Sequence, residues 1–175
     1  TETYDGAVPA SRALSRSLNI PSVIMLREYG YARFYHLLKK LGFNHFTQPA
    51  DHYGLSIILG GGEASLWDIT KAYAGMSRTV MRYHKTGGGY MDDTFSLQRL
   101  TTNSTTENGQ VDQFPPLDAG SVWCTFRALL EVNRPETELG WEAYSSSAPI
   151  AWKTGTSFGN RDAWAVGTTP DYVVG

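Results

Sequence analysis

Lys153-Thr154-Gly155-Thr156-Ser157 is the stretch from which the fold and the site of this chain are best approached. A cation, hydroxyls and a glycine stand together on an expected β-strand, where Lys153 and Gly155 face one way while Thr154 and Thr156 face the other. Gly155 lets a substrate backbone lie close to the strand. The stretch is therefore suited to binding a substrate carboxylate. An exposed strand with a lysine on its solvent face is the ordinary alternative.

The residues around this stretch predict the fold class. Residues 148–157 and 162–168 read as two strands joined by a turn, and another strand begins after a turn at residues 169–171. The chain before them is mainly helical up to residue 85. Helices first and adjacent strands last predict an α+β fold with an antiparallel sheet.

Helical periodicity and end signals predict the helices. They are expected at residues 10–18, 21–28, 31–41 and 66–78, with one more that follows Asp118 and ends at Pro135. Ser65 and Asp68 resemble a capping box at the start of the helix at 66–78. Residues 86–116 are rich in Gly, Thr, Asn, Ser and Gln and are expected to form an exposed loop. We therefore divide one partial domain, residues 1–175, into a helical part (1–85), a loop (86–116) and a helix with a strand hairpin (117–175).

Composition excludes several classes of protein. Hydrophobic residues make up 41% and charged residues 18%, as in a folded domain. A net charge of −2 gives no electrostatic case for nucleic-acid binding. The single Cys124, expected to be buried on a helix, excludes an internal disulfide, and the histidines lack metal-site spacing. We find no signal peptide or membrane-spanning run, and we expect the chain to be a fragment of a longer protein.

A second polar group, Ser17-Leu18-Asn19, lies between two expected helices. A serine there can relay a proton, and an asparagine two residues later can bind a substrate amide. The alternative is that Asn19 caps the helix that begins at Pro21.

Together, Ser-x-Asn and the downstream Lys-Thr-Gly resemble the second and third motifs of the penicillin-recognising serine acyltransferases, whose first motif is Ser-x-x-Lys. Flanking stretches at residues 12–23, 54–63, 66–67 and 72–74 resemble the class A penicillin-binding proteins. Residues 152–167 look most like the 1C subgroup of that family. The resemblance covers most of the chain except roughly residues 86–116.

The resemblance implies a penicillin-binding protein/β-lactamase-like transpeptidase fold that lacks its N-terminal part. It implies that Ser17 shuttles a proton, that Asn19 holds the amide of the donor peptide, and that Lys153 supplies positive charge. Thr154 and Thr156 would offer hydroxyls to the substrate carboxylate. The backbone N–H of Thr156 would form half of an oxyanion hole.

One departure from the family pattern is large. No serine in the chain is followed by a lysine three positions later, so the acyl-forming nucleophile and its base are absent. In the family they precede the second motif, and we therefore expect them upstream of Thr1. We also expect that this chain alone does not form an adduct with a fluorescent penicillin.

The resemblance implies a bifunctional peptidoglycan synthase at the periplasmic face of the bacterial inner membrane. An N-terminal anchor and a glycosyltransferase domain would precede a D,D-transpeptidase domain that crosslinks D-Ala-D-Ala stem peptides, binds β-lactams and needs no cofactor or metal. A D,D-carboxypeptidase, a serine β-lactamase and a non-catalytic scaffold module stay open as alternatives. So do the acceptor peptide, the oligomeric state and the activity of the glycosyltransferase half.

Overall fold

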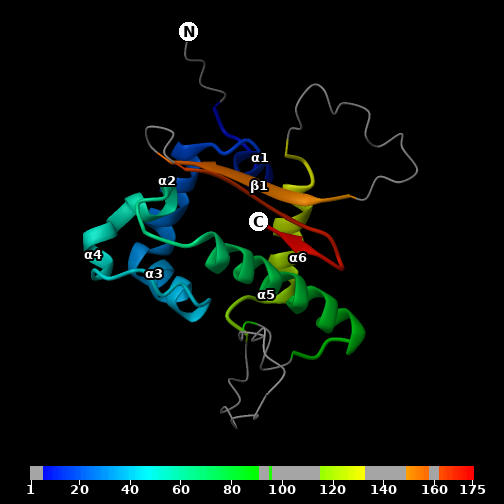
Figure 1. Cartoon of the computed structure of the whole chain (residues 1–175). Helices are drawn as coiled ribbons and strands as arrows, with labels where there is room; N and C mark the ends of the chain where they lie inside the picture. The colour runs from blue at the N-terminus through cyan, green and yellow to red at the C-terminus, as the bar shows by residue number, and fades with distance from the viewer. Residues whose placement is uncertain (1–5, 91–94, 96–114, 133–148, 158–161) are drawn as a thin grey trace, which may run out of the picture.

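The chain is an α+β structure in the computed structural model, which describes residues 6–90, 95, 115–132, 149–157 and 162–175. Figure 1 shows the sheet lying over α5 and α6, with α2, α3 and α4 grouped at one side. The elements, in order, are α1 (Ala10–Ser15), α2 (Asn19–Tyr29), α3 (Tyr31–Lys40), α4 (Ala50–Tyr53), the 3₁₀-helix η1 (Gly54–Leu59), α5 (Leu66–Lys85), α6 (Ala119–Leu129), β1 (Ala151–Thr156), β2 (Ala163–Thr168) and β3 (Val173–Val174).

The sheet is antiparallel, in the order β1-β2-β3, which confirms the predicted strands and the predicted fold class. Lys153 of β1 pairs with Val166 of β2, and directly opposite residues share one face of a sheet. Val166 and Thr168 are buried, and both β2 and β3 contact α5 while β1 contacts α6. The face that carries Lys153 is therefore the one that packs on the helices.

The helix signals in the sequence are largely confirmed, with corrected ends. The predicted capping box is present at the start of α5, but this helix continues to Lys85 rather than ending at residue 78. Asp118 caps α6 as predicted, through a 2.9 Å bond from the N–H of Ser121. This helix ends at Leu129, where the N–H of Glu131 bonds instead to the carbonyl of Ala128 in a tighter turn. Pro135 lies outside the described residues.

Two boundaries near the start of the chain were predicted wrongly. The helix α2 begins at Asn19 rather than Pro21, because an extended Leu18 precedes it and Pro21 fits in the first turn, where its missing N–H is not needed. The helix α1 ends at Ser15 rather than residue 18, because Ser17 turns out of the helix with a positive φ. Most of the predicted loop at 86–116 lies outside the described residues.

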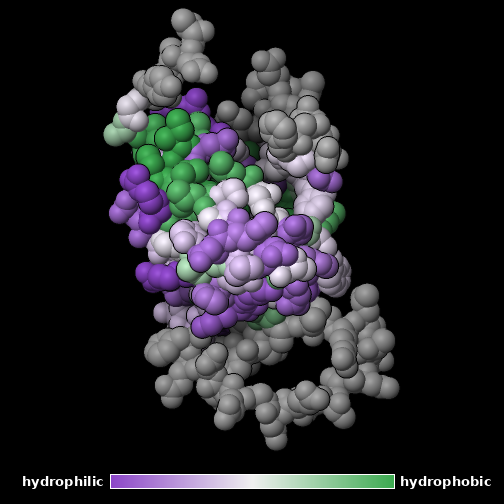
Figure 2. Space-filling model, turned by 90° about the vertical axis from the view of Figure 1, so that its left-hand side faces the viewer, coloured by the Kyte–Doolittle hydropathy of each residue, from purple (hydrophilic) through white to green (hydrophobic). Residues whose placement is uncertain are grey.

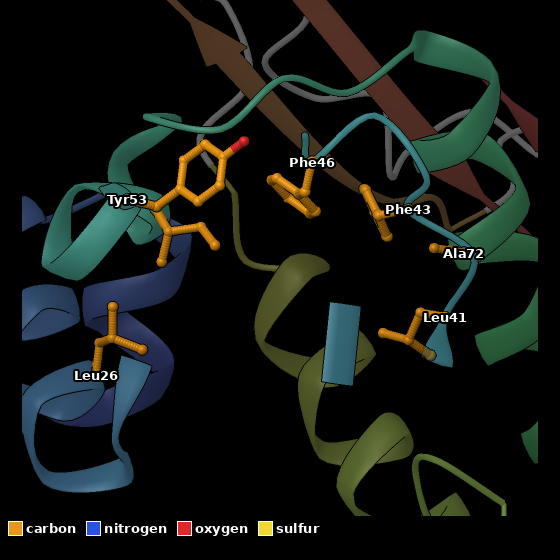
Figure 3. Close-up of a cluster of buried hydrophobic side chains, with 7 residues drawn as sticks. Leu26, Leu41, Phe43, Phe46, Tyr53 and Ala72 are labelled. Carbon is orange, nitrogen blue, oxygen red and sulfur yellow. The ribbon is translucent and has the colours of Figure 1, made fainter. Parts of the chain in front are cut away.

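One hydrophobic cluster joins α2, η1 and α5 through the chain between α3 and α4 (Figure 3). Phe46 meets Tyr53 edge to face, with ring centroids 5.3 Å apart, which is a favourable arrangement for two aromatic rings. The Tyr53 hydroxyl accepts from the backbone N–H of Gln48 at 3.2 Å. The buried members are Leu26, Leu41, Phe43, Phe46, Tyr53, Ile57 and Ala72. This cluster fixes the helical part of the fold.

A second buried region holds α6 against α1 and β1. Val122 and Leu129 of α6 are each only 1% exposed, and Ala13 of α1 and Ala151 of β1 are also buried. Because α6 contacts both α1 and β1, it brings the end of α1 close to the sheet. Of the two polar segments singled out in the sequence, one begins just after α1 and the other stands on β1.

The surface is mixed. Figure 2 shows hydrophobic residues gathering on the upper part of one face, at the height of α2, above a hydrophilic area. Ile20, Ile24 and Met25 of α2 are exposed. Cys124 is also exposed, so its predicted burial is wrong: it lies on a face of α6 that the described residues leave open. Within the described ranges no helix is long and apolar enough to span a membrane.

Candidate functional site

The fold brings Ser17 and Lys153 into direct contact. The Nζ of Lys153 donates a hydrogen bond to the Oγ of Ser17, although the two residues are 136 positions apart in the chain. The same nitrogen donates to the carbonyl of Thr154 at 2.6 Å. The two segments that sequence analysis selected independently therefore form one polar site between the end of α1 and β1.

The local backbone presents the Ser17 hydroxyl in an unusual way. The N–H of Leu18 bonds to the carbonyl of Ala13 at 2.9 Å, and the N–H of Ser17 bonds to the carbonyl of Leu14 at 3.1 Å. These two bonds are the Schellman pattern of a helix C-terminus, which places the residue after the cap in the left-handed region. Glycine usually stands there, whereas here it is Ser17, with φ of 54°.

This conformation has an energetic cost. A left-handed conformation costs a residue with a side chain roughly 1–2 kcal/mol, and Ser17 is the one non-glycine residue with a positive φ in the described part of the chain. Glycine would satisfy the same backbone bonds without this cost. A hydroxyl group held in this position against the local preference indicates that the side chain itself is needed.

Lys153 lies in a partly buried position on β1. Burial lowers the pKa of its ammonium group, because a low-dielectric environment disfavours the charged form. A lysine with a lowered pKa that contacts a hydroxyl group can exchange a proton with it more readily than a solvated lysine can. The contact and the lowered pKa are compatible with proton transfer between the two side chains.

The rest of the strand is open to a ligand. Thr154, Gly155 and Thr156 are exposed, and a side-chain carbon built at Gly155 would meet no atom within 4 Å. In the described sheet β1 is an outer strand, so its second edge can pair with an extended peptide. The hydroxyls of Thr154 and Thr156 lie on one face of β1 and Lys153 lies on the other. A carboxylate that contacts both would therefore have to bind at the edge of the strand.

Asn19 is exposed in the first turn of α2, two residues after Ser17. The residue that caps this helix is Leu18, and no side chain caps it by a hydrogen bond. The alternative that Asn19 caps a helix beginning at Pro21 is therefore wrong. Its amide lies on the surface beside the Ser17 turn.

Sequence analysis missed how the end of β1 is held. The N–H of Ser157 donates to the carbonyl of Asp162 at 2.9 Å, and the N–H of Asp162 donates to the Oγ of Ser157 at 2.8 Å. This pair closes the hairpin directly after Thr156. A serine at a strand end before a turn that contains Gly159 and Asn160 is the signal that was available. Arg161 lies outside the described residues.

A second polar cluster lies at the start of α5. Asp68 accepts from Ser65 Oγ at 2.8 Å, lies 3.1 Å from His45 Nε2 and 3.2 Å from Lys71 Nζ, and its side chain is only 7% exposed. Burial alone raises the pKa of the Asp68 carboxyl, but the bonds from Ser65 and Lys71 bring it below its usual value. The described residues contain no group of three His, Cys, Asp or Glu side chains placed to hold a metal ion.

Comparison with known proteins gives related sequences along nearly the whole chain. It is 34% identical over 172 residues to penicillin-binding protein 1C of Escherichia coli (strain K12), a match that covers 98% of this chain and 20% of that protein. Penicillin-binding protein 1A of Neisseria cinerea is 28% identical over 177 residues, and that of Neisseria lactamica is 28% identical over 180 residues. The chain spans about a fifth of the length of these relatives. No family model and no solved structure gives a significant match.

Proposed function

The chain belongs to the class A penicillin-binding proteins, as its motifs predicted, and on that basis we propose that it forms part of the D,D-transpeptidase domain of a peptidoglycan synthase. The observation that carries the proposal is the hydrogen bond from Lys153 to Ser17. Neither residue has a local structural reason to meet the other. Their contact supports one shared role of the two motifs in acyl transfer.

In the proposed reaction, a serine outside this chain attacks the carbonyl of the donor D-Ala-D-Ala. The lysine of its Ser-x-x-Lys motif would take the proton of that serine, the C–N bond breaks and an ester forms, while Ser17 gives its proton to the leaving amine and is reprotonated by Lys153. An acceptor amine then attacks the ester, the ester C–O bond breaks and a new amide forms. The proton of that amine passes through Ser17 back to Lys153, and the lysine of the Ser-x-x-Lys motif returns its proton to the released serine. The lowered pKa of Lys153 favours this exchange.

The remaining residues hold the donor in place. The exposed hydroxyls of Thr154 and Thr156 would bind its carboxylate together with the charge of Lys153. The backbone N–H of Thr156 would stabilise the oxyanion, and Asn19 would bind the amide of the donor. Gly155 leaves room for the donor backbone beside β1. β-Lactams would enter the same site as mimics of the donor.

For the whole protein we propose a location at the periplasmic face of the bacterial inner membrane, with an anchor and a glycosyltransferase domain ahead of this part. The substrates would be peptidoglycan stem peptides, with no metal or organic cofactor. The chain spans about a fifth of the length of its relatives. The reacting serine of the proposal belongs to a Ser-x-x-Lys motif, which residues 1–175 do not contain.

The test uses a fluorescent penicillin on two samples: this 175-residue chain, and a longer chain of the same protein that includes the expected upstream Ser-x-x-Lys. We expect a covalent adduct on the longer chain alone, at the serine of that motif. An adduct on a serine of residues 1–175 would refute the proposal. Adding an acceptor amine with a D-Ala-D-Ala peptide then separates the two reaction types, because a transpeptidase forms the crosslinked amide and a carboxypeptidase forms only the hydrolysed peptide.

A further inference from the structure

The first turn of α6 lies at the end of that helix away from β1 (Figure 1). A second cleft lies there, lined by residues of the last turns of α5 and the first turn of α6. Its volume is about 440 Å³, which lies within the range of small-ligand sites. Tyr83, His84 and Trp123 supply the large side chains of its lining, and Gly87, Gly88 and Gly120 supply bare backbone. The Ser17–Lys153 site shares none of these residues.

Aromatic rings stand open to solvent at this cleft. Trp123 is 53% exposed and Tyr83 is 39% exposed, although aromatic side chains contribute most to stability when they are buried. The ring of Tyr90 lies 5.0 Å from that of Tyr83. The guanidinium of Arg127, on the same helix, lies 5.4 Å from the centre of the Trp123 ring, within the range of a cation–π interaction.

The glycines shape the floor of the cleft. Gly87 and Gly88 have φ values of 66° and 115°, which allow the chain to turn sharply after α5. The hydroxyl oxygen of Tyr90 accepts a hydrogen bond from the N–H of Ala119 at 3.0 Å, so this turn is tied to the start of α6. The lining therefore combines the backbone of three glycines with the rings of Tyr83 and Trp123.

We propose that this cleft binds a saccharide. A pyranose ring presents C–H groups on its faces, which pack on aromatic rings, and hydroxyl or amide groups at its edge, which need hydrogen-bond partners. Tyr83 and Trp123 supply rings, while the imidazole of His84 and the guanidinium of Arg127 supply polar groups beside them. An extended peptide would instead need an open strand edge or a longer groove, and neither is present in the described residues around this cleft.

The identity of the saccharide as an N-acetylated glycan strand rests on the proposed function, because a crosslinking domain acts on peptides attached to such strands. Val80 adds an apolar side chain to the lining, which suits the methyl group of an N-acetyl substituent. Binding at this cleft would hold a glycan strand on the protein while its peptide reaches the Ser17–Lys153 site.

The experiment measures saturation-transfer NMR from this chain to a tetramer of N-acetylglucosamine, with a tetramer of glucose as the comparison sugar. We expect transfer to the N-acetylated tetramer, weaker transfer to the glucose tetramer, and a loss of at least about fivefold in Trp123→Ala. Trp67→Ala is the matched control, because Trp67 is 54% exposed and lies at the other end of α5. We expect this control to bind like the unchanged chain.

Tyr83→Leu provides a second variant that keeps an apolar side chain and removes the aromatic ring, and it should also weaken binding. The proposal is wrong if the unchanged chain shows no transfer, if Trp67→Ala weakens binding as much as Trp123→Ala, or if a free stem peptide binds at Trp123 in place of the sugar. None of these measurements involves acylation. A negative result for sugar binding would therefore not bear on the proposed transpeptidase function, which the penicillin experiment tests separately. Equal transfer to both tetramers would support a saccharide site but would refute the proposed preference for N-acetylated sugars.

Discussion

The start of α5 follows the usual capping rules, whereas the end of α1 departs from them at one residue. At the start of α5, Ser65 accepts from the N–H of Asp68 at 3.1 Å, and Asp68 accepts in return from the N–H of Ser65. At the end of α1 the backbone makes a regular Schellman pattern, but Ser17 stands where glycine is usual. The start of α5 therefore has favourable residues at both capping positions. The end of α1 has a serine whose left-handed conformation costs energy.

The difference teaches where to look for function. The Ser65 and Asp68 side chains satisfy groups within a few residues, so the capping box is explained by the stability of α5 alone. The Ser17 side chain has its partner on β1, far along the chain. A residue that breaks a local rule while making a distant polar contact is expected at a functional site.

The largest effect on stability is expected at the start of α5. Asp68→Ala removes a buried carboxylate that accepts from Ser65 and lies beside Lys71 and His45, and should lower the free energy of unfolding by about 3 kcal/mol. Urea unfolding followed by circular dichroism measures this loss. Asp118→Ala, which removes the exposed cap of α6, is the matched control and should cost clearly less. Equal losses in the two variants would contradict the structural importance given to the Asp68 cluster.

A smaller effect is expected at Ser17 itself. Ser17→Gly and Ser17→Ala both remove the hydroxyl group, but only glycine tolerates φ of 54° without strain. The glycine variant should therefore be more stable than the alanine variant by ~1 kcal/mol. Urea unfolding of the two variants under the same conditions gives this difference directly. If alanine proves as stable as glycine, the strain assigned to Ser17 is wrong.

The smallest effect is the titration of Lys153. Burial lowers its pKa, so its signal in NMR should titrate at lower pH than the ordinary value of a lysine side chain. Between the lowered pKa and the pKa of an unfolded lysine, the unfolded chain binds more protons, so the free energy of unfolding rises with pH across that interval. Lys153→Met should remove this part of the pH dependence. A Lys153 that titrates at or above the ordinary value of a lysine side chain would contradict the account.

Local signals in the sequence predicted much of the fold. The alternation after Lys153 gave the strand hairpin, and the Ser65 and Asp118 caps marked two helix starts that the structure confirms. The predicted end of α5 at residue 78 was wrong. Residues 79–85 carry no glycine or proline, so nothing in the sequence stops the helix there and it continues to Lys85.

The site was predictable only in part. The resemblance selected Ser17 and Lys153, but their contact depends on how α6 packs between α1 and β1, which no local pattern specifies. The left-handed backbone at Ser17 was missed for a related reason. A serine carries no signal for that conformation, and the missing glycine concealed the helix end. The exposure of Cys124 likewise depends on what packs against α6.

The central claim is that Ser17 acts with Lys153 in acyl transfer, and the rate of acylation of the longer protein by a fluorescent penicillin tests it most directly. Ser11→Ala is the matched control, because Ser11 is an exposed serine on the same helix α1. We predict that Ser17→Ala slows acylation by about a hundredfold or more, as expected for the loss of a proton relay, while Ser11→Ala leaves the rate unchanged. An unchanged rate in Ser17→Ala would contradict the account.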